Sequence, residues 1–137
     1  MTTVVDVLKA IADDKSLALF NNIALSNGDS DLLISTLDLT RKQYYSRLSA
    51  FINAGIVKRK RGKYSLTTFG KVLHHVQEII GKALNDYWQL KAIDSIIASV
   101  NKVPQEQFQR IIDTLIVNQQ IKDILKCEQS IQIQVRR

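Results

Sequence analysis

The sequence has little or none of several features that define large classes of protein. One cysteine, Cys127, among 137 residues excludes an internal disulfide framework. The chain opens without a basic and then apolar leader, so we do not expect secretion. Charged residues interrupt the longest apolar candidate before it reaches the roughly 18 to 20 residues that a membrane-spanning helix needs. We therefore expect a soluble cytoplasmic protein with no membrane partner.

Catalytic and metal-binding signatures are also missing. The sequence contains no phosphate-binding glycine loop, no nucleophile motif and no histidine–carboxylate pair at useful spacing. His74 and His75 are adjacent, so they lie about 100° apart around a helix and cannot both face one ion. We expect no enzymatic activity, no cofactor and no metal site within one chain, while a site across a dimer stays open.

Acidic residues are absent from the segment 40–63. This segment has a net charge of +8, whereas residues 1–39 have −4 and residues 64–137 have +2, which sum to the total of +6. A local block of positive charge attracts the phosphates of a polyanion. Its eight basic residues are Arg41, Lys42, Arg47, Lys58, Arg59, Lys60, Arg61 and Lys63.

Short helices are expected before this basic block. Thr2 or Thr3 can cap the first helix, and Asp13 and Asp14 close it and can cap a mostly buried second helix over residues 15–26. A turn at residues 27–29 then leads to the next helix.

A short third helix is expected from Ser30 or Asp31 and is followed by a three-residue connection, residues 38–40. That length is typical of a helix-turn-helix, although this connection lacks the glycine often found there. Thr40 is placed to cap the fourth helix.

The fourth helix has its inward face at Tyr44, Leu48 and Phe51, and it ends at Gly55, which suits a left-handed position. Two short strands, at 56–57 and 64–66, then flank a basic turn with a glycine at its tip. Burial of four or five basic residues would be prohibitively unfavourable, so the turn must lie in solvent or against an anion.

A long helix follows, capped by Thr67 or Thr68, with apolar positions alternating at spacings of three and four up to Val100. Only Asp86 breaks this pattern. About 30 residues would span roughly 45 Å, which is longer than this small domain can cover. Pairing of this helix with a second copy is the simplest way to bury the excess.

The remaining residues predict less regular structure. Pro104 suits the first position of another helix, and a change of phase near Asn118 indicates a bend or a short last helix over residues 120–126. Apolar and polar residues alternate from Ile131 to Val135, so the tail could add a strand or remain loose.

The order of these elements resembles the winged helix-turn-helix fold. The segment LSAFINAGIV, residues 48–57, resembles the end of the recognition helix in ArsR-type and MarR-type regulators, and TRKQYYSRLSA, residues 40–50, looks most like archaeal winged-helix transcriptional regulators. The likeness covers about residues 4–90. Metal-sensing ArsR members carry cysteines on the helix before the turn, and residues 31–37 contain none.

The resemblance places Gln43, Tyr45, Ser46 and Arg47 on a face that enters the major groove. The inward position assigned to Tyr44 independently supports the same outward face, because the residues next to Tyr44 in the helix point outward. Arg47 could bind guanine and Gln43 adenine. The expected DNA-binding residues are Arg41, Lys42, Gln43, Tyr45, Ser46 and Arg47 of the helix with Lys58, Arg59, Lys60, Arg61 and Lys63 of the hairpin.

We therefore expect a mainly α protein with a small β-hairpin wing, an α+β class. Residues 1–67 would form a winged helix-turn-helix DNA-binding region, and residues 68–137 a helical dimerisation and C-terminal region. The expected function is sequence-specific binding of double-stranded DNA by a homodimer that regulates transcription, in the cytoplasm and associated with the nucleoid. Two alternatives stay open: a non-specific chromatin-like DNA-binding protein, and a winged-helix protein-interaction module in a transcription or replication complex.

Overall fold

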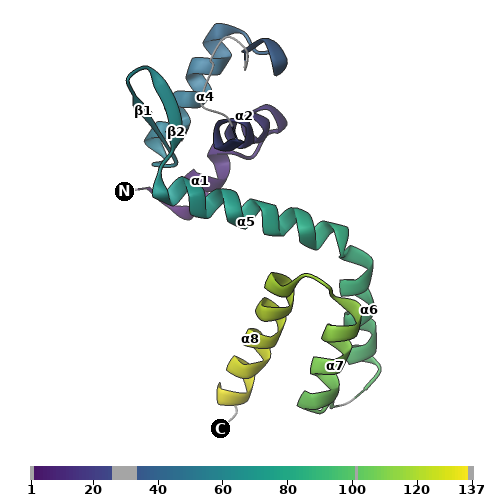
Figure 1. Ribbon diagram of the computed structural model, residues 1–137. Coiled ribbons are helices and arrows are strands. Elements are labelled where there is room, and N and C mark those ends of the chain that lie inside the picture. Colours follow the sequence, from purple (N-terminus) through teal and green to yellow (C-terminus); the bar gives the residue numbers. More distant parts are fainter. Residues whose placement is uncertain (1, 26–33, 101, 136–137) are drawn as a thin grey trace. The chain divides into compact units, whose positions relative to one another are not determined.

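The computed structural model describes residues 2–25, 34–100 and 102–135, with side chains up to Cys127 (Figure 1). It confirms the expected class: the chain is mainly helical, with one small antiparallel hairpin in the described residues. The helices are α1 (Val4–Ala10), α2 (Asp14–Leu25), α4 (Arg41–Asn53), α5 (Thr68–Asn85), α6 (Tyr87–Ala98), α7 (Gln105–Leu115) and α8 (Gln119–Val135), and the strands are β1 (Val57–Lys60) and β2 (Lys63–Leu66). No helix among the described residues has both the length and the apolar character needed to cross a membrane.

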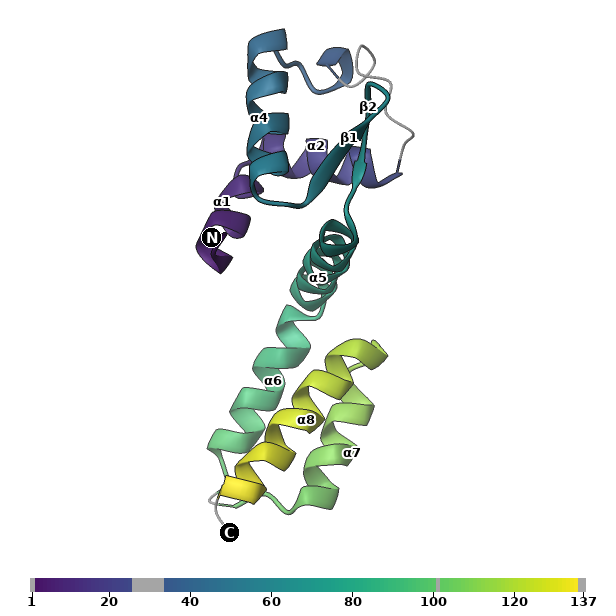
Figure 2. The same ribbon diagram turned by 90° about the vertical axis from the view of Figure 1, so that its left-hand side faces the viewer.

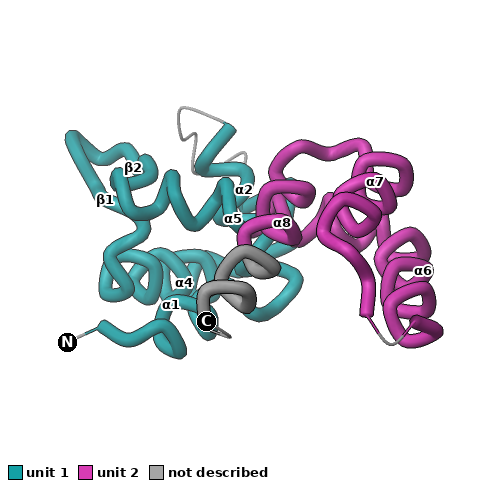
Figure 3. The backbone as a smooth tube through the Cα atoms, turned by 90° about the horizontal axis from the view of Figure 1, so that it is seen from below, with its two compact units in different colours: residues 1–76 teal, residues 77–137 magenta. Residues whose placement is uncertain are grey.

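Two compact units divide the chain, residues 1–76 and residues 77–137 (Figure 3). Each unit has its own cluster of buried apolar side chains. The boundary falls within α5, so the first turns of that helix belong to the first unit.

Phe20 of α2 lies at the centre of the first unit and is fully buried. Its ring makes edge-to-face contacts with Phe51 of α4, at 5.9 Å between centroids, and with His74 of α5, at 6.1 Å. α2 also contacts β2, and α4 contacts both α1 and β1 (Figures 1 and 2). Burial of these rings removes large apolar surfaces from water and fixes the orientation of α4.

The caps of the first two helices confirm the expectations from sequence. Thr3 caps α1 through a capping box. The Thr3 hydroxyl accepts a hydrogen bond from the Asp6 backbone N–H, and the Asp6 carboxylate accepts one from the Thr3 backbone N–H. Asp13 caps α2 by accepting hydrogen bonds from the backbone N–H and the hydroxyl of Ser16. The expected turn at residues 27–29 and the start of the third helix lie outside the described residues.

The connection into α4 needs no glycine, because Asp38 takes the left-handed conformation with φ of 52°. Residues 34–36 are helical, and their end has the hydrogen-bond pattern of a Schellman motif. The Leu39 N–H donates to the Ile34 carbonyl at 3.1 Å, and the Asp38 N–H donates to the Ser35 carbonyl at 3.3 Å. Aspartate tolerates this conformation better than most residues, which explains how the turn forms.

The first turn of α5 is fixed against the chain reversal that follows α4. The Thr67 hydroxyl donates to the Gly55 carbonyl at 2.6 Å and accepts from the Gly70 N–H at 2.9 Å, so Thr67 caps α5 as expected. The Thr67 N–H donates to the Ile56 carbonyl at 3.1 Å. Gly70 is buried against Ile56 so closely that no side chain fits between them.

In the second unit, α7 packs against α6 and α8. Ile93, Ile112, Ile116 and Ile121 form the buried cluster between these three helices. This arrangement buries one face of each helix within a single chain.

The prediction of one continuous helix up to Val100 is wrong. The helix is interrupted at Asp86, which separates α5 from α6 and has non-helical backbone angles of φ −96° and ψ 16°. Asparagine and aspartate are weak helix formers, and α6 gains its own packing partner in α7. Asp86 is the one position that departs from the apolar pattern, but the spacing of three and four resumes after it, so the pattern was also compatible with one continuous helix.

The expectation of a strand or a loose tail after Ile131 is also wrong, because α8 continues to Val135. The predicted break near Asn118 is present, and the Asn118 side chain accepts a hydrogen bond from the Ile121 N–H at the start of α8. The last helix is therefore longer than the expected residues 120–126.

Two glycines of α5 provide a matched test of this packing. In Gly70→Ala, the new Cβ would overlap the Ile56 carbonyl oxygen and lie 2.9 Å from its carbon, so we expect the free energy of unfolding to fall by at least about 2 kcal/mol. In Gly81→Ala, the new Cβ meets nothing within 4 Å, so the better helix propensity of alanine should raise the free energy of unfolding by about 0.5–1 kcal/mol. Denaturant unfolding measures both, and equal effects would contradict the close contact.

Candidate nucleic-acid interface

The helix α4 is oriented by its buried face. Tyr44, Leu48 and Phe51 are at most 1% exposed, as the sequence predicted for the inward positions. The helix ends in a Schellman motif, where Gly55 has φ of 78° and the Ile56 N–H donates to the Phe51 carbonyl. Both ends and one face are therefore fixed, and the remaining face is available to a partner.

Five of the expected DNA-binding residues lie on that remaining face. The exposed set is Arg41, Lys42, Gln43, Tyr45 and Ser46. Gln43 also belongs to the capping box of α4: its N–H donates to the Thr40 hydroxyl, and its side-chain oxygen accepts from the Thr40 N–H, both at 3.1 Å. The ring of Tyr45 rests edge-on against Tyr44 at 5.1 Å, so its position is partly set by the core.

Arg47 differs from these residues because its side chain is only 24% exposed. One guanidinium nitrogen, Nη2, lies 3.4 Å from Oδ1 of Asp13, and Nη1 donates to the Gln43 carbonyl at 3.5 Å. Its Nε is buried and has no hydrogen-bond partner among the residues that the structure describes. The structure thus places Arg47 at the edge of the exposed face, where it connects α4 to the start of α2.

Sequence reasoning missed Asp13 as a partner of α4, although the position of Arg47 held a signal. Arg47 lies three residues after Tyr44 and four before Phe51, so it flanks the buried face. Asp13 has its pKa lowered mainly by hydrogen bonds from the N–H and hydroxyl of Ser16, with a smaller contribution from Arg47. The same carboxylate therefore caps α2 and binds α4.

The wing, residues 57–66, is closed by a two-residue turn. Arg61 and Gly62 have φ of 55° and 77°, and Lys60 pairs with Lys63 across the turn. Positive φ at both positions is the pattern of a type I′ turn, which matches the twist of a hairpin. The turn directs three cations to the tip of the wing, namely Lys60, Arg61 and Lys63.

The other two cations of the wing have different surroundings. Arg59 lies opposite Tyr64 in the hairpin, with its guanidinium carbon 5.9 Å from the centre of that ring, a cation–π distance. Lys58 lies opposite Ser65 near the base of the wing. Within the part of the chain that the structure describes, none of the five wing cations is ion-paired with a carboxylate.

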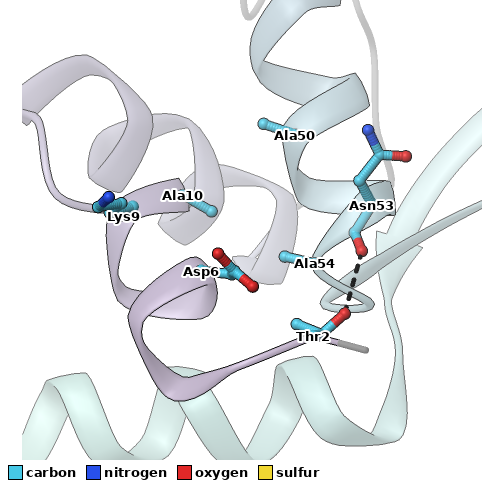
Figure 4. A pocket seen from close by; sticks show the side chains of 7 residues that line it. All are labelled: Thr2, Asp6, Lys9, Ala10, Ala50, Asn53 and Ala54. Carbon is cyan, nitrogen blue, oxygen red and sulfur yellow. Dashed lines mark hydrogen bonds between the residues drawn. The ribbon is translucent and has the colours of Figure 1, made fainter.

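A shallow cavity of about 410 Å³ lies between α1 and the C-terminal half of α4 (Figure 4). Ala10, Ala50 and Ala54 contribute apolar lining. Two of its polar side chains already have local roles, because Asp6 is part of a capping box and the Thr2 hydroxyl donates to the Asn53 carbonyl at 3.5 Å. The charged residues that line it, Asp6 and Lys9, have opposite charges.

Comparisons with known proteins identify no relative. No protein-family model matches the chain, and no curated protein or solved structure is significantly similar to it. Over residues 2–25, 34–100 and 102–127, no three histidine, cysteine or acidic residues come together in a way that could hold a metal ion.

Substitutions of Asp13 should separate its charge from its capping role. Asparagine still caps a helix, so Asp13→Asn should lower the free energy of unfolding at pH 7 by less than about 1 kcal/mol, and Asp13→Ala by about 1 kcal/mol or more. Because the folded pKa lies below the ordinary 3.8, the stabilisation by the charge is present above that value and is lost as the pH falls through the folded pKa.

Denaturant unfolding between pH 7 and pH 2.5 measures this difference. The gap between wild type and Asp13→Asn should close at the acid end, whereas a gap of constant size would show that the carboxylate charge contributes nothing.

Proposed function

We propose that this protein is a sequence-specific double-stranded-DNA-binding regulator of transcription that acts as a homodimer. The observation that carries the proposal is the continuous segment 40–63, which has eight basic residues and no acidic one and forms α4 and most of the wing. The inward half of α4 is buried, so its polar residues face outward. The resemblance to winged-helix regulators of archaea adds to this reading.

In this proposal α4 enters the major groove and the exposed side chains of its first two turns contact base edges. Tyr45 and Ser46 are exposed and can do so without rearrangement. A bidentate contact from Gln43 to adenine would require its side-chain oxygen to leave the Thr40 N–H. A contact from Arg47 to guanine would likewise require the guanidinium to leave Asp13. Base readout by these two residues is therefore coupled to local rearrangement.

The tip of the wing would bind the DNA backbone. Lys60, Arg61 and Lys63 extend from a rigid turn, so they can follow phosphates without losing much conformational freedom. Such contacts contribute affinity and register but read no sequence directly. Release of counterions from the phosphates then makes affinity depend steeply on salt.

Dimerisation is proposed through α5, the long helix after Thr68. Five large apolar side chains follow one side of this helix at spacings of three or four, and each is between 45% and 67% exposed in the single chain. An exposed apolar stripe of this length is typical of a protein interface. The residues are Phe69, Val72, Val76, Ile80 and Leu84.

A second candidate function is non-specific binding of DNA. The engagement of Gln43 and Arg47 by Thr40 and Asp13 favours it, because the two side chains best suited to base readout have partners within the chain. The wing tip would then supply most of the affinity through phosphates.

The salt dependence of binding tests the role of the wing. If about five phosphates are bound per chain, a dimer should show a log-log slope of affinity against salt near −9. Replacement of Lys60, Arg61 and Lys63 by glutamine removes six of these contacts per dimer and should flatten the slope by about 5. Fluorescence anisotropy with a labelled duplex measures both.

The control replaces Lys9, Lys82 and Lys102 by glutamine, which removes the same charge outside α4 and the wing. Its slope should stay close to that of the wild type. Equal slopes for the wild type, the wing variant and the control would show that the wing does not contact DNA. Weak binding without salt dependence would favour a protein-interaction module.

A charge placed in the α5 stripe tests the dimer. Val76→Glu with Ile80→Glu puts two carboxylates on apolar positions that a partner would cover, so the protein should become monomeric. Val117→Glu, which adds one carboxylate at an apolar side chain that is 90% exposed between α7 and α8, is the control and should remain dimeric. Sedimentation equilibrium measures the masses, and a monomeric wild type would contradict the proposal.

A further inference from the structure

A hollow of about 340 Å³ lies at the base of the wing, between α2, the two strands and the first turns of α5. Four polar side chains line it. Lys58 and Ser65 come from the wing, and Lys71 and His74 come from α5. None of the described residues that line it is acidic, and two of them are lysines.

Regular secondary structure brings these four groups together. Lys58 and Ser65 are opposite each other in the hairpin, so their side chains lie on the same face. Lys71 and His74 are three residues apart in α5, so they share one side of that helix. The start of α5 is in turn fixed by the hydrogen bonds of Thr67, which holds the two pairs in position.

The geometry suits an anion with a partly apolar body. Lys58 and Lys71 both line the hollow, so an anion bound there would be attracted by two positive charges. The serine hydroxyl can donate a further hydrogen bond. Ile23 and Leu66 form part of an apolar wall, and both are nearly buried. The volume lies within the range of small-molecule sites.

We propose that this hollow binds the phosphate group of a small molecule. Lys58 and Lys71 bind the charge, Ser65 donates to a phosphate oxygen, and the apolar wall contacts the remainder of the ligand. A phosphate of the DNA backbone has the same chemistry, but the hollow lies at the base of the wing and is backed by the buried core, whereas the exposed tip is better placed for a duplex.

Occupancy would couple the ligand to the wing. Lys58 is part of β1, so a bound phosphate connects the hairpin to α5 and holds it in one orientation. This regulatory consequence rests on the proposed DNA binding, whereas binding of the phosphate itself does not.

To test the site, the full chain is titrated with inorganic phosphate at constant ionic strength. Binding is monitored through the chemical shifts of backbone amides in NMR spectra. Saturable shifts at Lys58, Ser65 and Lys71, with a dissociation constant in roughly the millimolar range, are expected for so small a probe. Lys71→Gln should weaken binding about tenfold, because it removes one charged hydrogen bond. Lys82→Gln, at another exposed lysine of α5, should bind as the wild type does.

Linear shifts spread over the surface, or equal binding by Lys71→Gln and Lys82→Gln, would overturn the site. Circular dichroism in phosphate-free buffer shows whether each variant is folded, and Lys58→Gln provides a second variant from a different element.

A second titration, with a DNA duplex bound, separates the two sources of phosphate. Persistence of the shifts supports a small-molecule ligand, and their loss by competition would assign the hollow to the DNA backbone instead. Failure to bind any duplex would contradict the proposed function and leave the first titration as an independent result.

Discussion

The packing of α4 against Phe20 is the interaction on which the candidate interface depends. Phe51 meets that ring edge-to-face, and Tyr44 and Leu48 are buried along the same side of the helix. This burial fixes the rotation of α4 about its axis and so decides that Tyr45 and Ser46 point outward. The basic wing follows only a few residues later, so the same core also positions its first strand.

The basic segment is divided into groups with different surroundings rather than one uniform charged patch. The wing tip is exposed on a tight turn, Arg59 stacks on Tyr64, and Lys58 lines the hollow at the wing base. Arg47 is engaged by Asp13, a residue 34 positions earlier in the chain. Among the described residues, the cations of the wing tip are therefore exposed and lack an ion pair, whereas Arg47 of α4 is restrained by Asp13.

Local signals in the sequence predicted the elements that depend on local chemistry. The Thr40 cap, the buried positions of α4 and the glycine of the hairpin turn follow from spacing and backbone preference, and the structure confirms them. The break lies at Asp86, the one residue that departs from the apolar pattern, but the spacing resumes after it, so the pattern did not distinguish one helix from two that follow each other. The contact of Arg47 with Asp13 depends on tertiary packing and was also missed, although the helical position of Arg47 placed it beside the core.

The most direct measurement of the central claim is selection of bound fragments from genomic DNA by the purified protein, with sequencing after a wash at moderate salt. Recovery of a shared inverted-repeat sequence, with half-sites about one helical turn apart, is the result expected for a dimer that reads bases with α4. Strong retention of fragments that share no sequence would contradict specific recognition and support backbone binding through the wing. Failure to retain DNA would contradict nucleic-acid binding altogether.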